Sequence, residues 1–144
     1  MGKYYKSTEE MYKVLGALFE KVKFDAEVGK KLKAAKIAVR FRYRDPEGSA
    51  TINAKDKQAD ANAFFEYSFG KTDAPVDVEL TNSADFAHRF WHGKENAVMS
   101  IALGKMSAKG DLSKAMAMLP AIKPVYRMFP KVLQEIGRND LVLR

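Results

Sequence analysis

The chain has 144 residues, of which 47% are hydrophobic and 30% are charged. This is the length of one ordinary domain, and the composition excludes a disordered or collagen-like chain. Cysteine is absent, which excludes disulfides, thiolate metal sites and a cysteine nucleophile and fits a reducing compartment. No apolar run approaches the roughly 20 residues of a membrane span, and the first residues lack a signal-like apolar stretch. We therefore expect a soluble, cytoplasmic protein.

The net charge of +7 raises the question of a nucleic-acid partner. Residues 1–44 carry 12 basic and 5 acidic groups, residues 45–104 carry 5 and 10, and residues 105–144 carry 8 and 3. A duplex-binding domain usually gathers its positive charge into one footprint. We therefore predict no nucleic-acid partner, and interpret the basic ends as solvated surfaces or as a transient contact with an anionic membrane.

The first half of the chain is predicted to hold two helices followed by strands. Ser7 provides an N-cap for an apolar stripe of 3–4 spacing that ends at Val22, and Asp25 caps a shorter helix rich in lysine. From residue 37 the apolar period falls from 3.6 to 2, which predicts a strand over 37–44. Three further strands are expected over 49–54, 63–69 and 76–80.

The helical period returns in the second half, where Phe86, Phe90 and Trp91 share a helix face. A second apolar helix is expected over 96–103, and a short fifth strand over 105–109. The C-terminal helical region is predicted to be interrupted at three prolines, Pro120, Pro124 and Pro130. This order of elements indicates an α+β fold and not a doubly wound one.

Two histidines are the only residues whose spacing suggests a metal site. His88 and His92 lie four apart on the predicted helix, with Asp85 one turn earlier. Because they fall off the apolar face, we interpret them as partly exposed helix residues. No nucleophile elbow, phosphate-binding glycine loop or dinucleotide fingerprint occurs. We therefore predict no catalytic residue, no metal and no cofactor.

Basic and aromatic residues alternate along the strand predicted over 37–44. Strand geometry sends Arg40, Arg42 and Arg44 to one face and Phe41 and Tyr43 to the other. The rings therefore cannot stack bases where the arginines would meet phosphates. A solvated basic face is the favoured interpretation, and the arginines could also meet anionic lipid headgroups.

Five of the seven methionines lie between Met99 and Met128. Methionine is flexible and polarizable and adapts to irregular apolar partners. A methionine-rich helical layer over an aromatic sheet face could line a pocket for a lipid tail. Composition alone favours an ordinary core, so both interpretations stay open at this point.

Two segments resemble the sterol carrier protein 2 family. Residues 77–81 (DVELT), followed by Ser83, Phe86 and Gly93-Lys94, are similar to that family's strand–helix segment. Residues 104–111 (GKMSAKGD), with Ala115-Met116 close behind, are similar to its most recognisable stretch. The likeness is specific over 76–119, agrees in element order from about residue 8, and is weakest after Pro120.

The resemblance implies a five-stranded, mostly antiparallel sheet covered on one face by helices, with an apolar tunnel between them. Such domains carry sterols, fatty acids, fatty acyl-CoA or phospholipids without catalysis, and some are fused to enzymes or help them oligomerise. On this basis residues 1–144 form a single domain. It divides into a helical N-terminal extension (1–36), a family-like sheet and helices (37–119) and a helical tail (120–144).

We therefore predict a noncatalytic protein that binds and carries a lipid or fatty acyl ligand. The alternative is an interaction or oligomerisation module that uses the same methionine-rich helices, and a homodimer is left open. The residues expected to line the tunnel lie on apolar faces or in the family-like segment. They are Phe41, Tyr43, Phe65, Tyr67, Phe86, Phe90, Met99, Leu103, Met106, Met116 and Ile122.

Overall fold

The fold is built on a five-stranded sheet whose strands lie in the order β3-β2-β1-β4-β5. The computed structural model describes residues 2–56 and 58–144. β1 pairs in parallel with β4, and the other three pairings are antiparallel. This open, mostly antiparallel sheet confirms the predicted α+β class. The strands are β1 (Ala38–Arg44), β2 (Gly48–Asn53), β3 (Glu66–Phe69), β4 (Val78–Ser83) and β5 (Ser107–Gly110).

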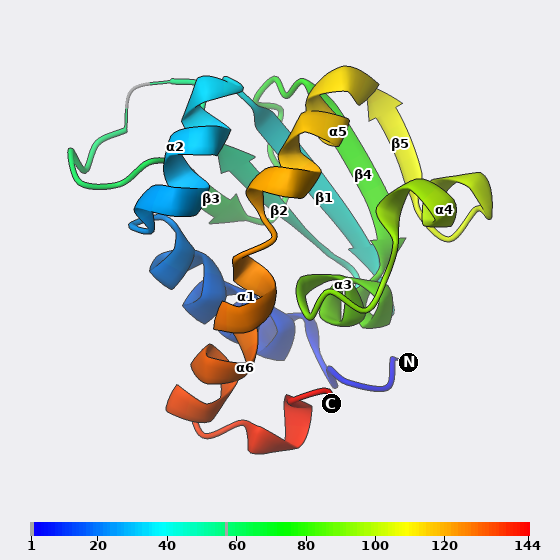
Figure 1. Ribbon diagram of the computed structural model, residues 1–144. Coiled ribbons are helices and arrows are strands. Elements are labelled where there is room, and N and C mark those ends of the chain that lie inside the picture. The colour runs from blue at the N-terminus through cyan, green and yellow to red at the C-terminus, as the bar shows by residue number, and fades with distance from the viewer. Residues whose placement is uncertain (1, 57) are drawn as a thin grey trace.

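Helices gather on one face of the sheet (Figure 1). Five of them begin at a polar side chain that accepts a hydrogen bond from the first turn, as at Ser7, where Oγ accepts from the backbone N–H of Glu10 at 3.1 Å. The helices are α1 (Thr8–Val22), α2 (Ala26–Ala34), α3 (Ala84–Trp91), α4 (Ala97–Ala102), α5 (Leu112–Ala121) and α6 (Val125–Glu135), with a 3-10 turn, η1 (Asn139–Leu141).

The central strand β1 separates the two sides of the sheet. Val39, Phe41 and Tyr43 are buried beneath the helices, whereas Arg42 and Arg44 are exposed on the opposite face. The predicted alternation is confirmed for Arg42 and Arg44, whereas the prediction that Arg40 is solvated was wrong, because Arg40 is only 8% exposed. The core therefore lies on the helical side alone.

The third strand is shorter than the sequence pattern predicts. The pattern places a strand over 63–69, but β3 begins at Glu66. The backbone N–H of Phe64 donates to the carbonyl oxygen of Lys23 at 2.8 Å. This bond ties the preceding segment to the end of α1, so it does not pair with β2.

The C-terminal helical region is broken once, not at each proline. Pro120 lies in the last turn of α5 and Pro130 lies within α6, and the break falls at 122–124 between them. The prediction of interruptions at Pro120 and Pro130 was therefore wrong. Each proline removes one backbone donor, and the fully buried side chains of Phe129 and Leu133 hold α6 against the core.

Candidate functional site

An apolar cavity lies between the inner face of the sheet and the helices α1, α2, α3 and α5. Its volume is about 20 Å³, and every side chain in its wall is apolar in character. The wall also includes Val125 at the start of α6, so helices from the N-terminal and C-terminal parts of the chain both contribute to it. The lining residues are Phe19, Val22, Val28, Leu32, Ile37, Val39, Ile52, Phe65, Trp91, Met118, Ile122 and Val125.

A second apolar cavity, of about 10 Å³, lies on the other side of α5, towards α4. Met118 belongs to the walls of both cavities, so this one side chain stands between them. The remaining residues of the second wall are Leu80, Phe90, Ala97, Ile101, Met106, Ala115, Met116 and Leu119.

Both cavities are small. A volume of about 20 Å³ has room for roughly one water molecule and not for an acyl chain. Over residues 2–56 and 58–144 the apolar space is thus two small compartments divided by Met118. The open tunnel implied by the family resemblance stays a prediction.

The structure separates the predicted tunnel residues into three groups. The first group is neither fully buried nor part of a cavity wall. Tyr67 is partly buried on β3, where its hydroxyl donates to Glu20 Oε1 at 2.7 Å, and Met99 and Leu103 are exposed. Five residues line a cavity: Phe65 and Ile122 the first, and Phe90, Met106 and Met116 the second. Three are buried in the core without lining either cavity: Phe41, Tyr43 and Phe86.

Part of the first cavity wall was missed by the sequence prediction. Val28 and Leu32 of α2 and Trp91 of α3 line it. The signal was present, because each belongs to an apolar helical stripe visible in the sequence. The missing information was that α2 packs beside α5 over the sheet, a contact between segments about eighty residues apart.

Three buried polar side-chain atoms have no hydrogen-bond partner among the described residues. They are Tyr43 Oη, Asn82 Oδ1 and Trp91 Nε1. Tyr43 and Asn82 are register partners on β1 and β4, and Trp91 lies in the first cavity wall. Burial raises the pKa of the Tyr43 hydroxyl, and the nearby Trp91 indole partly opposes that rise. Buried groups of this kind normally have partners, so the interior retains unused hydrogen-bonding capacity.

His88 and His92 are both buried, which corrects the prediction that they are partly exposed. His88 Nδ1 accepts from the hydroxyl of Tyr5 at 2.7 Å, and Nε2 donates to the carbonyl oxygen of Leu141 at 2.7 Å. His92 Nδ1 donates to the carbonyl oxygen of His88 at 2.8 Å, and Nε2 accepts from the backbone N–H of Leu143 at 3.3 Å. These bonds fix one neutral tautomer for each ring and join both ends of the chain to α3.

The histidine environment favours the neutral rings. Burial lowers the pKa of His88 to about 4, and the bond to Leu141 only partly offsets this. Burial also lowers the pKa of His92. These histidines therefore have a structural role, and the described residues contain no group of three or more His, Asp or Glu side chains placed to hold a metal ion.

The open face of the sheet carries a broad polar groove of about 760 Å³. Arg40 and Arg42 lie in its wall, and both pair with Glu79, at 3.6 and 3.1 Å. Arg40 also donates to the carbonyl oxygen of Ala74, because the connection between β3 and β4 crosses this face. The pairing reduces the positive charge that these arginines offer to a headgroup or a phosphate.

The five-stranded sheet with helices on one face, and small apolar cavities between the two layers, define an α+β protein. The model of the SCP-2 sterol transfer family matches residues 16–123. The chain belongs to this family. A comparison with curated proteins found no match, and within the described residues no helix has the length and apolarity needed to cross a membrane.

Solved structures agree with this fold. Sterol carrier protein 2 from Yarrowia lipolytica (apo form) is 18% identical, with a TM-score of 0.59 over 88% of this chain and 96% of that chain. Sterol carrier protein domain 2 of Helicoverpa armigera is 22% identical, with a TM-score of 0.62 over 81% and 88%. A sec-alkylsulfatase from Pseudomonas sp. is 12% identical, with a TM-score of 0.53 over 65% of this chain and 14% of that enzyme. Identities this low show a likeness of fold alone.

The stability of the protein is expected to fall in mild acid because of His88. Its pKa is about 4 in the folded state and 6.5 as the ordinary value, so the unfolded chain binds this proton more readily between those limits. Stability is therefore lost as the pH falls from 6.5 towards 4, by up to about 3 kcal/mol for this group. Urea unfolding at a series of pH values measures the loss.

The matched variant is His88→Gln, whose amide can keep both hydrogen bonds but does not titrate. It should lose the part of the pH dependence that His88 causes between 6.5 and 4, and keep the part that His92 causes, since burial also lowers the pKa of His92. An unchanged slope in this variant would show that other groups cause the acid sensitivity.

Proposed function

We propose that the protein binds a lipid noncatalytically and carries it with its apolar part between the sheet and the helices α1, α2 and α5. The observation that carries this proposal is the wholly apolar wall of the first cavity in a member of the SCP-2 sterol transfer family. Fatty acids, fatty acyl-CoA, sterol-like molecules and phospholipids are the ligand classes, and a cytoplasmic location stays a prediction.

Binding requires the two small cavities to enlarge. The two compartments lie on either side of α5, and its Met118 side chain is unbranched and adaptable. The chain is non-helical at 122–124, where Ile122 lines the first cavity. A movement of the Met118 side chain together with the non-helical segment 122–124 would join the compartments into one elongated space. We propose that the ligand occupies that joined space.

The energetics allow a useful affinity. Burial of about ten methylene groups at roughly 0.8 kcal/mol each contributes about 8 kcal/mol, a micromolar affinity before the cost of opening is subtracted. The unpartnered Trp91 Nε1 in the wall can donate to one ligand oxygen. This favours a ligand that carries a hydrogen-bond acceptor beside a long apolar chain.

A brominated fatty acid should quench the fluorescence of Trp91, the one tryptophan of the chain and a residue of the cavity wall. We expect 9,10-dibromostearic acid to quench most of the emission of delipidated protein, because bromine must approach the indole closely. Unbrominated stearic acid should bind without quenching.

The control moves the tryptophan to the surface. Phe24 is 44% exposed and lies outside both cavity walls, so F24W in a W91F background should resist quenching. Equal quenching at both positions, or no quenching at Trp91, would contradict ligand binding in the cavity.

Met118→Ala should weaken folding and strengthen lipid binding. Removing a buried methionine side chain costs about 2–5 kcal/mol of stability, and here the space released joins two cavities. We expect a tighter dissociation constant for palmitate, measured by isothermal titration, together with a lower melting temperature.

Met11→Ala is the matched control, because Met11 is fully buried and lines neither cavity. It should lower the melting temperature without tightening palmitate binding. If both variants change the affinity equally, Met118 does not divide a binding space.

A further inference from the structure

Residues 96–105 form a projecting lobe, which we call the α4 lobe. It consists of α4, its Asn96 cap and the turn that leads towards β5. Figure 1 shows α4 standing out beside β5 at the edge of the molecule. The outward side chains of Val98, Met99 and Leu103 are 56%, 59% and 65% exposed.

The exposed apolar residues of the protein are concentrated in this region. Over the described residues, seven large hydrophobic side chains are exposed, and five of them fall between Val98 and Met116. Single exposed apolar residues are ordinary on a protein surface, but a cluster marks an interaction site. The remaining two, Phe24 and Ile136, lie in the turns that follow α1 and α6.

α4 is apolar on both sides. Ala97 and Ile101 face inward and line the second cavity, while Val98 and Met99 face outward. A surface helix normally turns a polar face to water. The outer face of α4 is therefore as apolar as a surface that is normally buried, yet it is exposed in the isolated chain.

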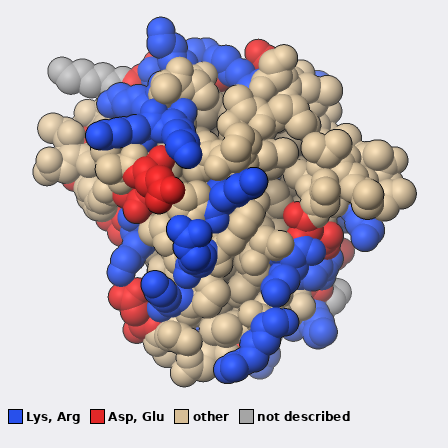
Figure 2. All heavy atoms as spheres, viewed as in Figure 1, with Lys and Arg blue, Asp and Glu red and all other residues tan. Residues whose placement is uncertain are grey.

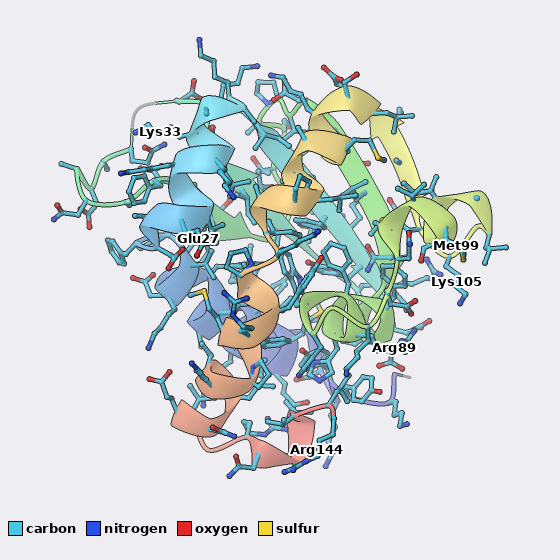
Figure 3. All side chains as sticks on the ribbon, viewed as in Figure 1. Glu27, Lys33, Arg89, Met99, Lys105 and Arg144 are labelled. Atoms are coloured by element: carbon cyan, nitrogen blue, oxygen red, sulfur yellow. The ribbon has the colours of Figure 1, made fainter. Side chains whose placement is uncertain are left out.

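The charge of the lobe has a single sign. Residues 96–105 contain Lys105 and no acidic residue, and Lys109 follows on β5. Figure 3 shows Met99 and Lys105 extending from the same lobe, and Figure 2 shows its surface as uncharged, with both basic and acidic side chains near its base. Glu95, just before the lobe, is already paired with Arg89 at 2.9 Å.

We propose that the α4 lobe inserts into the interface of a bilayer that contains anionic phospholipid. Val98, Met99 and Leu103 enter the boundary between headgroups and acyl chains, and the ammonium of Lys105 remains among the phosphates. A projecting tip can enter this interface without a complementary surface. The net charge of +7 draws the chain towards an anionic membrane.

This placement brings the bilayer beside the second cavity. Met116 is 37% exposed and also lines that cavity, next to Ala97 and Ile101 on the inner side of α4. The inference goes beyond lipid binding, because it assigns a surface for docking. Docking does not require the cavity to be occupied.

Co-sedimentation with vesicles tests the proposal. We expect the protein to bind vesicles of phosphatidylcholine with phosphatidylglycerol more tightly than vesicles of phosphatidylcholine alone. The double variant Met99→Glu and Leu103→Glu should lower the partition coefficient by about tenfold or more, since two apolar side chains are withdrawn from the interface.

The double variant Phe24→Glu and Ile136→Glu is the matched control, with the same added charge at exposed apolar sites in the turns after α1 and α6. Its loss of binding should be much smaller. An equal loss in both variants, or no binding by the unmodified chain, would overturn the proposal. So would a dimer in sizing chromatography that only the lobe variant converts to a monomer, because the lobe would then cover a second copy.

The test also separates docking from ligand binding. Met99 and Leu103 lie outside both cavity walls, so the lobe variant should keep the quenching of Trp91 by dibromostearic acid. Retained quenching with lost sedimentation supports the docking surface. Lost quenching in that variant would mean that the substitutions disturb the cavity, and the lobe assignment would fail.

Discussion

The alternation along β1 is the constraint on which the rest of the structure depends. β1 is the central strand, and its apolar side chains point to one face while its arginines point to the other. Helices can bury apolar stripes on the first face only, because the second would require them to cover charged groups. Arg40 is buried, and its guanidinium is compensated by hydrogen bonds to Thr51 and a backbone carbonyl and by an ion pair with Glu79. The apolar cavities therefore occur beneath the helices, and the polar groove occurs opposite.

The helices that cover β1 are short, and this governs the interior. α2 has 9 residues and α5 has 10, so neither spans the sheet alone, and the seam beneath α5 is filled by flexible residues such as Met118. Methionine fills irregular gaps without fixing one packing. Under the proposed function, this flexible layer would rearrange as an apolar ligand enters. The two readings of the methionine-rich segment, core and pocket wall, are compatible in this arrangement.

Local patterns predicted the elements well, and distant contacts decided the rest. The stripe of α1, the alternation of β1 and the caps at Ser7 and Asp25 follow from neighbouring residues, and the structure contains them. His88 shows the limit of such patterns: α3 is buried on nearly all sides, and the partners of His88 come from Tyr5 and Leu141 at opposite ends of the chain. Met99 and Leu103 show a second limit, because an apolar residue on a helix is not necessarily buried. The parallel pairing of β1 with β4 also depends on a crossover that local spacing does not encode.

The position of α4 connects the two proposals in physical terms. Its inner side chains close the second cavity, and its outer side chains have no cover in the isolated chain. In water, burial of its inner side chains holds α4 against the body, because moving the helix would expose the inner face in addition to the outer one. In a bilayer interface that penalty falls, since both faces then contact apolar material. A membrane would therefore reduce the cost of moving α4 away from Met116 and the cavity behind it, so that exchange of a lipid is favoured at the membrane and opposed in water.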